Sequence, residues 1–474
     1  MSNFGLSLEN HYAQLPEDFY TKMPAEKVGA ALRLVHANKA AAALLDLDPA
    51  VFNDPHFVEA AGGHRPLEGF SPLAMVYSGH QFGVWAGQLG DGRALLIGQV
   101  RNRKGELWDI QLKGSGKTPY SRFGDGRAVM RSTIREYLCS EAMAALGIPT
   151  SRALAIVATG ETVKREMREP GAVLTRLARS HVRFGHFEHF FHRGQKDEVR
   201  RLADYVIAEY FPEFSGDYAG WFGEVVKRTA DMIAQWQAVG FAHGVMNTDN
   251  MSILGLTLDY GPYGFMDAYD PQFICNHTDE QGRYSFINQP AIAHWNLRAL
   301  ALAVSDLVPT DQLLERLTAY EECFGTKYRE LLRAKLGLTR EEEGDDKLIG
   351  DLLALMAQAR ADYTLSFRNL SGGDKDWLAL FGNFERHARA WLSRYRTRTG
   401  DEDLSGLNRI NPKFVLRNWV AEAAIRAVED KGDVATLDRI FRILQSPFEK
   451  HDGGEAFAAP PPPEMCHLEV SCSS

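Results

Sequence analysis

The chain has 474 residues, enough for about three domains of ordinary size. Its 53 Lys and Arg residues and 62 Asp and Glu residues give a net charge of −9 at pH 7, so we expect no nucleic-acid partner, because binding a phosphate backbone requires basic surface. Apolar residues make up 45% of the chain and charged residues 24%, a globular composition that excludes wholesale disorder.

The segment 1–20 has neither the basic start nor the apolar core of a secretory signal. Apolar runs fall far short of the roughly 20 residues that a membrane-spanning helix needs, so no membrane partner is expected. The five cysteines are scattered and lack zinc-finger spacing: Cys139, Cys275, Cys323, Cys466 and Cys472. We therefore expect a cytoplasmic protein of a reducing compartment, without a disulfide framework.

Residues 1–86 are expected to form an extension of short helices and loops, with helical apolar faces around 32–35 and 44–45. Residues 87–170 then change to a strand-rich pattern. Its elements, in order, are strands at 94–100 and 107–113, a glycine-rich loop at 114–126, a helix at 127–146 and a strand at 152–159.

Residues 171–457 are expected to be mainly helical, and residues 458–474 to form a flexible tail that contains Cys472. The predicted helices span 199–209, 223–239, 291–304, 310–336, 347–365 and 412–429. The fold class is therefore α+β. A small strand-rich lobe preceding a large helical lobe is the order found in protein kinases.

Residues 116–118 (Gly-Lys-Thr) resemble the end of a phosphate-binding P-loop, but Gln111 stands where that motif requires glycine. Lys113 is more informative, because it ends a predicted strand and Glu136 follows 23 residues later on the next helix. In kinase-like folds a strand lysine contacts nucleotide phosphates and is held by such a glutamate. Taken alone, the two residues are better explained as an exposed strand lysine and an exposed helix glutamate.

The segment 243–267 carries the strongest signal. A kinase catalytic loop reads H-R-D-x-x-x-x-N and is followed by D-F-G. Here Asn250 lies seven residues after His243, as in that loop. The sequence Asp-Tyr-Gly, which begins at Asp259, stands where D-F-G belongs. The catalytic-base position holds Val245, which cannot accept a proton, so Asp249 is the only nearby carboxylate of the loop. A turn rich in Asn and Asp is the structural alternative.

Arg176, Arg179 and Arg183 would lie on one side of a helix, as a guanidinium cluster for polyphosphate or as a solvated basic face. Three histidines follow, at His186, His189 and His192. No second group of metal ligands accompanies them in the sequence, so we expect them to pack or hydrogen-bond among the neighbouring phenylalanines rather than to bind a metal.

Taken together, these segments resemble the selenoprotein O family. The similar segments are GQLGDGRALLIGQV, DIQLKGSGKTPYSRFGDGRAVMRSTIREYL, VLTRLARSHVRFGHFE, HGVMNTDNMSILGLTLDYGPYGFMD and GRYSFINQPAIAHWNL. The resemblance implies a protein-kinase-like fold that transfers AMP from ATP to Ser, Thr or Tyr hydroxyls of target proteins. It also implies that ATP is bound inverted relative to kinases and that Mg²⁺ or Mn²⁺ is the cofactor.

The resemblance also assigns roles to individual residues. The ATP-binding residues would be Gly90, Gly92, Arg93, Lys113, Asp125, Gly126, Arg176, Arg183 and Asp259. Glu136 would orient Lys113, Asn250 and Asp259 would hold the metal, and Asp249 would accept the proton. Cys472, third from the C-terminus where the family carries selenocysteine or cysteine, is predicted to form a redox-regulatory disulfide with Cys275.

Three other functions stay open from the sequence. An atypical protein kinase differs mainly in which phosphate is attacked. Transfer of UMP from UTP is a close variant, because phosphate-binding motifs do not select the base. A nucleotide-binding pseudokinase scaffold is favoured by Val245 taken alone, whereas the set of Lys113, Glu136, Asn250 and Asp259 favours an enzyme.

Overall fold

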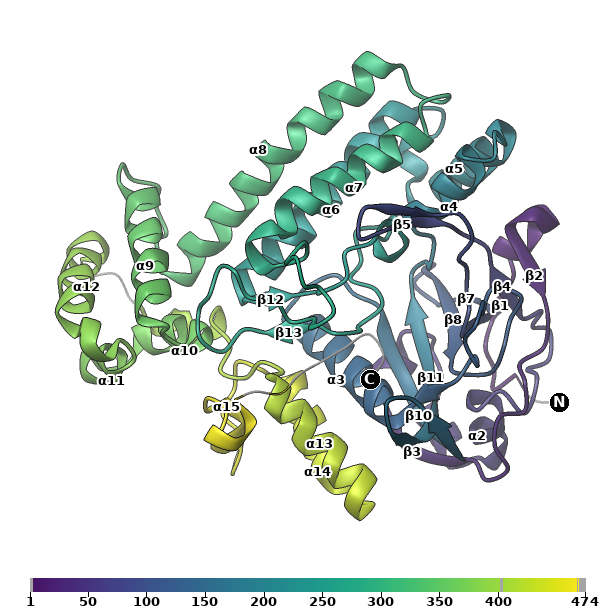
Figure 1. The fold of residues 1–474 in the computed structure, drawn as a ribbon, viewed down its shortest axis with the longest axis horizontal. Coiled ribbons are helices and arrows are strands. Elements are labelled where there is room, and N and C mark those ends of the chain that lie inside the picture. The colour runs from purple at the N-terminus through teal and green to yellow at the C-terminus, as the bar shows by residue number, and fades with distance from the viewer. Residues whose placement is uncertain (1–2, 401–403, 467, 469–474) are drawn as a thin grey trace.

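The computed structural model describes residues 3–400, 404–466 and 468. A strand-rich region and a helical region lie side by side (Figure 1), which confirms the α+β class. The strand-rich region is built on one antiparallel sheet. Its main strands, in spatial order, are β2 (Tyr20–Lys22), β4 (Leu73–Met75), β7 (Ala94–Arg101), β8 (Leu107–Lys113), β11 (Arg168–Ala178), β10 (Arg152–Lys164) and β3 (Arg33–Ala37).

Alternation along the strands divides their apolar side chains between two cores, because successive side chains of a strand point to opposite faces. Leu96, Ile156 and Leu174 belong to the large core that also contains helix α3 (Met130–Ala145). Their neighbours in sequence belong to the core on the other face, with residues of the short helices α1 (Lys39–Ala43) and α2 (Pro55–Ala61). The sheet is therefore covered on both faces, and its strands read as continuous apolar runs.

The expectation of helices and loops before residue 87 is partly wrong. Residues 33–37 form the edge strand β3, which pairs with β10, and β2 and β4 extend the opposite edge of the same sheet. Two shorter strands join it as well, β1 (Leu8–Glu9) beside β7 and β9 (Ala128–Val129) beside β11. Adjacent apolar residues such as Leu34 and Val35 fit a helix face or a strand, and only long-range pairing decides between them.

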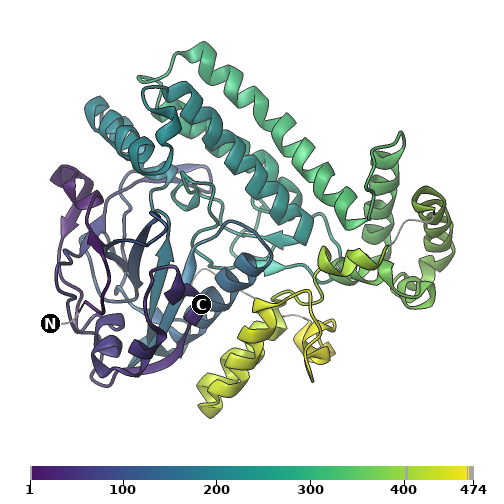
Figure 2. The same ribbon diagram turned by 180° about the vertical axis from the view of Figure 1, so that it is seen from behind.

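The helical region is built around three long helices that run together in Figures 1 and 2. These are α6 (Tyr218–Val239), α7 (Gln289–Ala303) and α8 (Thr310–Lys335). The remaining helices are α4 (Phe184–Phe191), α5 (Lys196–Tyr210), α9 (Asp345–Ala359), α10 (Tyr363–Arg368), α11 (Asp374–Ala379), α12 (Glu385–Thr399), α13 (Asn418–Lys431), α14 (Val434–Gln445) and α15 (Glu455–Ala458). Two small antiparallel sheets of two strands each are also present. One is the hairpin of β5 (Gly79–Gln81) with β6 (Val84–Ala86), and the other pairs β12 (Phe241–Ala242) with β13 (Gly264–Phe265) across the segment 243–263.

Among the helices whose boundaries differ from the prediction, two have a clear local cause. The helix expected over 347–365 is interrupted after α9, where Arg360 has a left-handed φ of +48° and Asp362 caps the new helix α10 by accepting from Leu365 N at 2.8 Å. The helix expected from 412 begins only at Asn418. The preceding residues are held in a non-helical path by two backbone N–H groups, those of Lys413 and Phe414, which donate to the Pro447 carbonyl.

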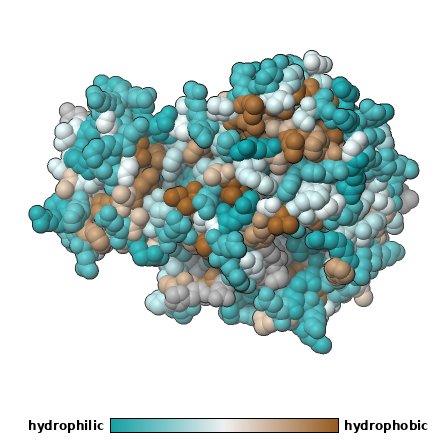
Figure 3. All heavy atoms as spheres, turned by 45° about the horizontal axis from the view of Figure 1, so that its top comes forward, coloured by the Kyte–Doolittle hydropathy of each residue, from teal (hydrophilic) through white to brown (hydrophobic). Residues whose placement is uncertain are grey.

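The surface shown in Figure 3 is largely hydrophilic, with hydrophobic residues in separate patches. No helix in residues 3–400, 404–466 and 468 is long and apolar enough to cross a membrane. Large apolar side chains that stay exposed include Phe82, Val84 and Phe123, and Phe123 is fully exposed.

One half-buried carboxyl group is expected to make a pH-dependent contribution to stability. Burial raises the pKa of Glu429 on α13 to about 7, although Arg131 on α3, 4.0 Å away, opposes the shift. Between the ordinary pKa of 4.5 and 7, the folded protein holds a proton that the unfolded chain has lost, so this group costs stability as pH rises. The amide side chain of the Glu429→Gln variant has no charge to gain, so the variant avoids this cost. We expect the difference in Tm, variant minus wild type, to be about 2–4 °C larger at pH 8 than at pH 5. Thermal unfolding at both pH values checks this, and an unchanged difference would contradict it.

Candidate active site

A cavity of about 770 Å³ lies where the sheet meets the helical region, within the usual size range of ligand sites. Its lining combines residues of the sheet, the glycine-rich loop and the segment 245–262. The predicted site residues that line it are Gly90, Gly92, Arg93, Lys113, Asp125, Gly126, Arg176, Arg183, Asp249, Asn250 and Asp259. Glu136 lies behind this surface, almost fully buried. Predicted site residues separated by up to 169 positions in the sequence, from Gly90 to Asp259, thus share one cavity.

Lys113 and Glu136 form a buried ion pair at the wall of this cavity. Strand β8 ends at Lys113, and helix α3 places Glu136 so that its carboxylate accepts a hydrogen bond from Lys113 Nζ. Burial lowers the pKa of Lys113, and Glu136 opposes that shift. Burial alone would raise the pKa of Glu136, but Lys113 and Arg176 lower it below its ordinary value. The carboxylate therefore stays ionised and fixes two cations.

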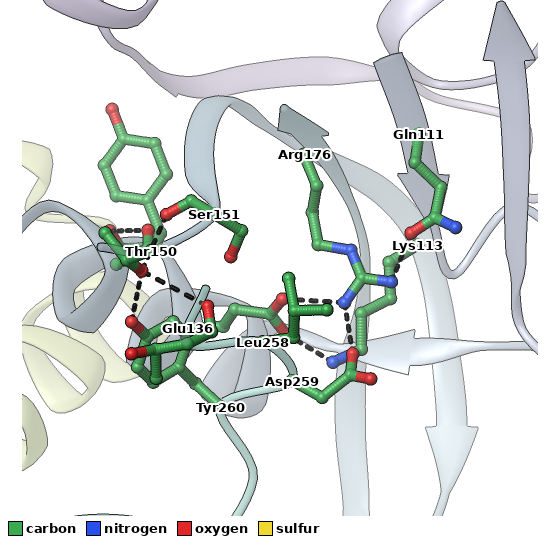
Figure 4. Close-up of polar contacts among 12 residues, drawn as sticks. Gln111, Lys113, Glu136, Thr150, Ser151, Arg176, Leu258, Asp259 and Tyr260 are labelled. Atoms are coloured by element: carbon green, nitrogen blue, oxygen red, sulfur yellow. Dashed lines mark hydrogen bonds and ion pairs between the residues drawn. The ribbon is translucent and has the colours of Figure 1, made fainter. Parts of the chain in front are cut away.

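Arg176 lies in strand β11, so the helical spacing expected for the three arginines is wrong. Its register is set by pairing with Gln111 of β8, and its guanidinium donates to the Gln111 side chain. One nitrogen, Nη1, also donates to Glu136 Oε1 at 3.0 Å and to Asp259 Oδ1. Figure 4 shows Arg176 between these three partners. A single guanidinium thus links the sheet, α3 and the segment that contains Asp259.

Arg183 reaches the same carboxylate from the N-cap position of α4. Its Nη1 donates to Asp259 Oδ2 and to the backbone carbonyl of Asp249 at 2.6 Å, and its guanidinium lies 5.1 Å from the Tyr77 ring centroid. Arg179 takes no part, because its Nε donates to the Leu107 carbonyl at 2.9 Å away from this cluster. Two of the three predicted arginines therefore converge on one aspartate.

Asp259 is the electrostatic centre of the site. Burial would raise its pKa, but Arg183, Arg176 and Lys113 hold the pKa well below its ordinary value. Its backbone has a left-handed φ of +57°, a conformation that costs free energy for a residue with a side chain. The strained turn is what directs this carboxylate at both arginines. Both carboxylate oxygens have a guanidinium partner.

Two side-chain hydrogen bonds hold the loop before Asp259. His243 is buried, and its Nε2 lies 2.8 Å from the Leu258 carbonyl, which ties the loop to the segment that carries Asp259. Asn250 uses its amide nitrogen to donate to the Val245 carbonyl at 3.0 Å. Because the amide nitrogen is used in this way, the amide oxygen of Asn250 is available to bind a cation. Oxygen ligands suit Mg²⁺ and Mn²⁺.

Asp249 has one carboxylate oxygen engaged and one without a hydrogen-bond partner among the described residues. Its Oδ2 accepts from Gln81 Nε2 at 3.1 Å, whereas the buried Oδ1 has no such contact within residues 3–400, 404–466 and 468. Burial raises the pKa of Asp249 to about 6, and Arg183 opposes the rise. Asp249 lines the cavity, and a carboxylate oxygen without a hydrogen-bond partner is chemically suited to accept a proton or to contact a cation.

The glycines of the cavity are explained first by packing. Gly90 has φ +121°, and a side chain there would meet Tyr120 Cγ at 2.6 Å and the Met75 carbonyl oxygen at 2.9 Å. Gly126 has φ +72°, and a side chain there would meet the Gly116 backbone at 2.1 Å. Without side chains at these positions, the loop 114–126 can pack closely against Gly90 and against itself. The packed loop forms part of the cavity wall. No helix follows Lys117, so the P-loop alternative is excluded.

Sequence reasoning missed several cavity residues that belong to other segments. Gln81 comes from the β5 hairpin and contacts Asp249. Arg165, between β10 and β11, donates to both carboxylate oxygens of Asp125 at 2.8 and 3.0 Å and lowers its pKa. Asp91 is buried and accepts from Met75 N at 3.1 Å, and its place between Gly90 and Gly92 was the one local signal for it.

The remaining candidates lie outside the cavity lining. Cys275 is buried, with its thiol donating to the Ala242 carbonyl at 3.4 Å. Cys472 lies outside the described residues, so the disulfide between them stays a prediction. His186 accepts from Arg183 N at 3.0 Å, and His189 contacts Ser78 Oγ at 2.9 Å.

Comparisons with known proteins show which family the chain belongs to. The model of the family described as protein adenylyltransferase SelO matches residues 3–445. Proteins named protein nucleotidyltransferase YdiU are similar over almost the whole chain.

The one from Myxococcus xanthus is 50% identical over 488 residues, covering 99% of both chains. The one from Bordetella avium is 50% identical over 486 residues, covering 99% of this chain and 98% of its own. The one from Pectobacterium carotovorum is 51% identical over 481 residues, covering 98% and 99%. The resemblance found in the sequence is confirmed, and the chain belongs to the SelO family of nucleotidyltransferases.

Proposed function

We propose that this protein transfers AMP from ATP to Ser, Thr or Tyr hydroxyls of other proteins and releases pyrophosphate. The observation that carries the proposal is the convergence of Lys113, Arg176 and Arg183 around Asp259, in a cavity whose kinase-type base position is Val245. Three cations at one point suit a polyphosphate leaving group. The fold is proposed to be kinase-like, with ATP inverted so that its α-phosphate faces the acceptor.

Asn250 and Asp259 are proposed to hold Mg²⁺ or Mn²⁺, which would offset charge on the phosphoryl oxygens when bound. The donor set fits such a cation, because it supplies one amide oxygen and one carboxylate that stays ionised. The arginines use the Asp259 carboxylate as their counter-charge. A cation on the same carboxylate would weaken those pairs, so Arg176 and Arg183 become available to the β- and γ-phosphates. Metal and nucleotide binding should therefore be coupled.

Asp249 is proposed to accept the proton of the attacking hydroxyl. The acceptor oxygen forms a bond to the α-phosphorus, the bond from that phosphorus to the bridging oxygen breaks, and the electron pair leaves with pyrophosphate. The partnerless Oδ1 of Asp249 is the atom suited to take the proton. Phe82 and Phe123, which line the cavity and are exposed, are proposed to contact the protein substrate at its mouth.

The position of the label in ATP distinguishes the candidate reactions. We expect the full chain, incubated with Mg²⁺ or Mn²⁺, to incorporate label from α-labelled ATP and none from γ-labelled ATP, because the α-phosphorus is the proposed target. The measurement is radiolabel bound to the chain and to added proteins. Asp249→Asn is the matched control for the proposed acceptor, since it keeps the size of the side chain and loses the base.

Each other outcome selects an alternative. Label from γ-labelled ATP alone would make the protein an atypical kinase. More label from α-labelled UTP than from ATP would make it a UMP transferase. If no label were transferred from ATP or UTP although the protein still bound nucleotide, the protein would be a pseudokinase scaffold.

A further inference from the structure

A second group of metal-type ligands lies outside the cavity lining. His80 of β5, Glu188 of α4 and His192, which follows α4, each offer one ligand atom, and these atoms lie within 4.8 Å of one another. Glu188 and His192 are four residues apart and share one side of the helix. The sequence showed only the helix histidines. The strand residue that completes the group comes from 108 positions earlier in the chain.

The carboxylate of Glu188 is the central observation. Its side chain is 1% exposed, and Oε1 lies 2.5 Å from His80 Nδ1. Its second oxygen, Oε2, is buried and has no hydrogen-bond partner among the described residues. Buried carboxylate oxygens are normally paired, so an unpartnered one on a residue that offers a ligand atom within 4.8 Å of two histidine nitrogens is suited to a cation.

The rings around the group orient its histidines. The Trp85 ring centroid lies 4.0 Å from that of His192, and the Trp295 centroid lies 5.3 Å from that of His80. Packing of this kind restricts the imidazoles to few orientations, as the surroundings of metal-bound histidines do. His192 is exposed, so its ring has room for the small shift that closer coordination requires.

We propose that His80, Glu188 and His192 form a Zn²⁺ site with a fourth position open to water. Two imidazoles and one carboxylate are a donor set that zinc takes, and nitrogen ligands favour it over Mg²⁺. Ligand atoms that all lie within 4.8 Å of one another are near enough to share one cation with bonds of about 2.0–2.2 Å after small side-chain shifts.

The site would fasten the β5 hairpin to α4 and thereby to the active site. His80 N donates to Thr248 Oγ1 at 2.7 Å, and the next residue, Gln81, donates to Asp249 Oδ2 at 3.1 Å. Zinc at His80 would therefore hold in place the strand that contacts the proposed acceptor. His80 and Gln81 act in this proposal as positioning residues.

The test uses the full chain, stripped of metal with a chelator and kept free of nucleotide, and titrated with zinc sulfate by calorimetry. We expect one Zn²⁺ per chain, bound at least about tenfold more weakly by His192→Ala and by Glu188→Gln. His387→Ala removes an exposed histidine on α12 and should bind as wild type. Asp259→Asn should also retain the zinc, which separates this site from the proposed nucleotide metal. Titration with Co²⁺ should give the visible absorption of a tetrahedral nitrogen and oxygen site, lost in the first two variants.

Equal zinc affinity in wild type and His192→Ala would overturn the proposal, as would the absence of binding in wild type. His192 is exposed, so its replacement should leave the fold intact, and circular dichroism checks this. The zinc measurement contains no nucleotide or protein substrate, so its result is independent of the proposed AMP transfer.

Discussion

Replacing Asp259 with alanine is expected to reduce nucleotidyl transfer by about a thousandfold or more. The variant loses the carboxylate proposed to hold the metal, and the charge stabilisation that a metal supplies is worth several kcal/mol, at tenfold in rate for each 1.4 kcal/mol. It also leaves Arg176 and Arg183 buried without the carboxylate that both contact. The measurement is the initial rate of label transfer from α-labelled ATP at saturating Mg²⁺ or Mn²⁺.

A loss of folding would imitate this result, so two further variants accompany it. Asp259→Asn keeps the size of the side chain and should also be inactive, with a smaller decrease in Tm. Asp231→Ala removes a partly exposed carboxylate on α6 that pairs with Lys227 at 2.7 Å and does not line the cavity, and it should retain wild-type transfer. Full activity in folded Asp259→Ala would show that the metal and arginine assignments are wrong.

Glu136→Gln is expected to decrease both stability and nucleotide affinity. The carboxylate is buried between Lys113 and Arg176, and removing its charge leaves Lys113 without its counter-charge. Breaking a buried pair in this way costs about 3–5 kcal/mol in the free energy of unfolding. Because Glu136 also sets the position of Lys113, we expect nucleotide to bind about tenfold more weakly. Urea denaturation measures the first effect and calorimetric titration with ATP the second.

Glu141→Gln is the matched control, because it changes a second buried glutamate of the same helix. Glu141 pairs with Arg152 at 2.6 Å, away from the cavity lining. This variant should lose stability and keep the nucleotide affinity of wild type. If both variants lost affinity equally, Glu136 would act on the nucleotide only through the stability of α3.

Much of the site followed from short sequence intervals. Strand 107–113 was predicted with the boundaries of β8, and the interval of 23 residues from Lys113 to Glu136 spans the loop and the first turns of α3. The interval of seven from His243 to Asn250 likewise lies within one loop. Such intervals depend on local backbone geometry, which the residues themselves largely control.

The errors arose where long-range pairing decided the conformation. The spacing of Arg176, Arg179 and Arg183 fits a helix, but Arg176 lies in β11 because that strand pairs with β8 and β10. Leu34 and Val35 became an edge strand for the same reason. Hydrogen bonds between distant strands override weak local preference, and a single sequence does not show which strands will meet.

The sequence by itself determined the α+β class, the family and the residue types of the cavity. Only the tertiary structure decided that Arg176 and Arg183 share the Asp259 carboxylate and that Asp249 keeps an oxygen without a partner among the described residues. It alone brought His80 to Glu188 and His192. Residue types and short intervals are properties of the local chain, whereas burial, charge pairing and ligand geometry arise only when distant segments pack together.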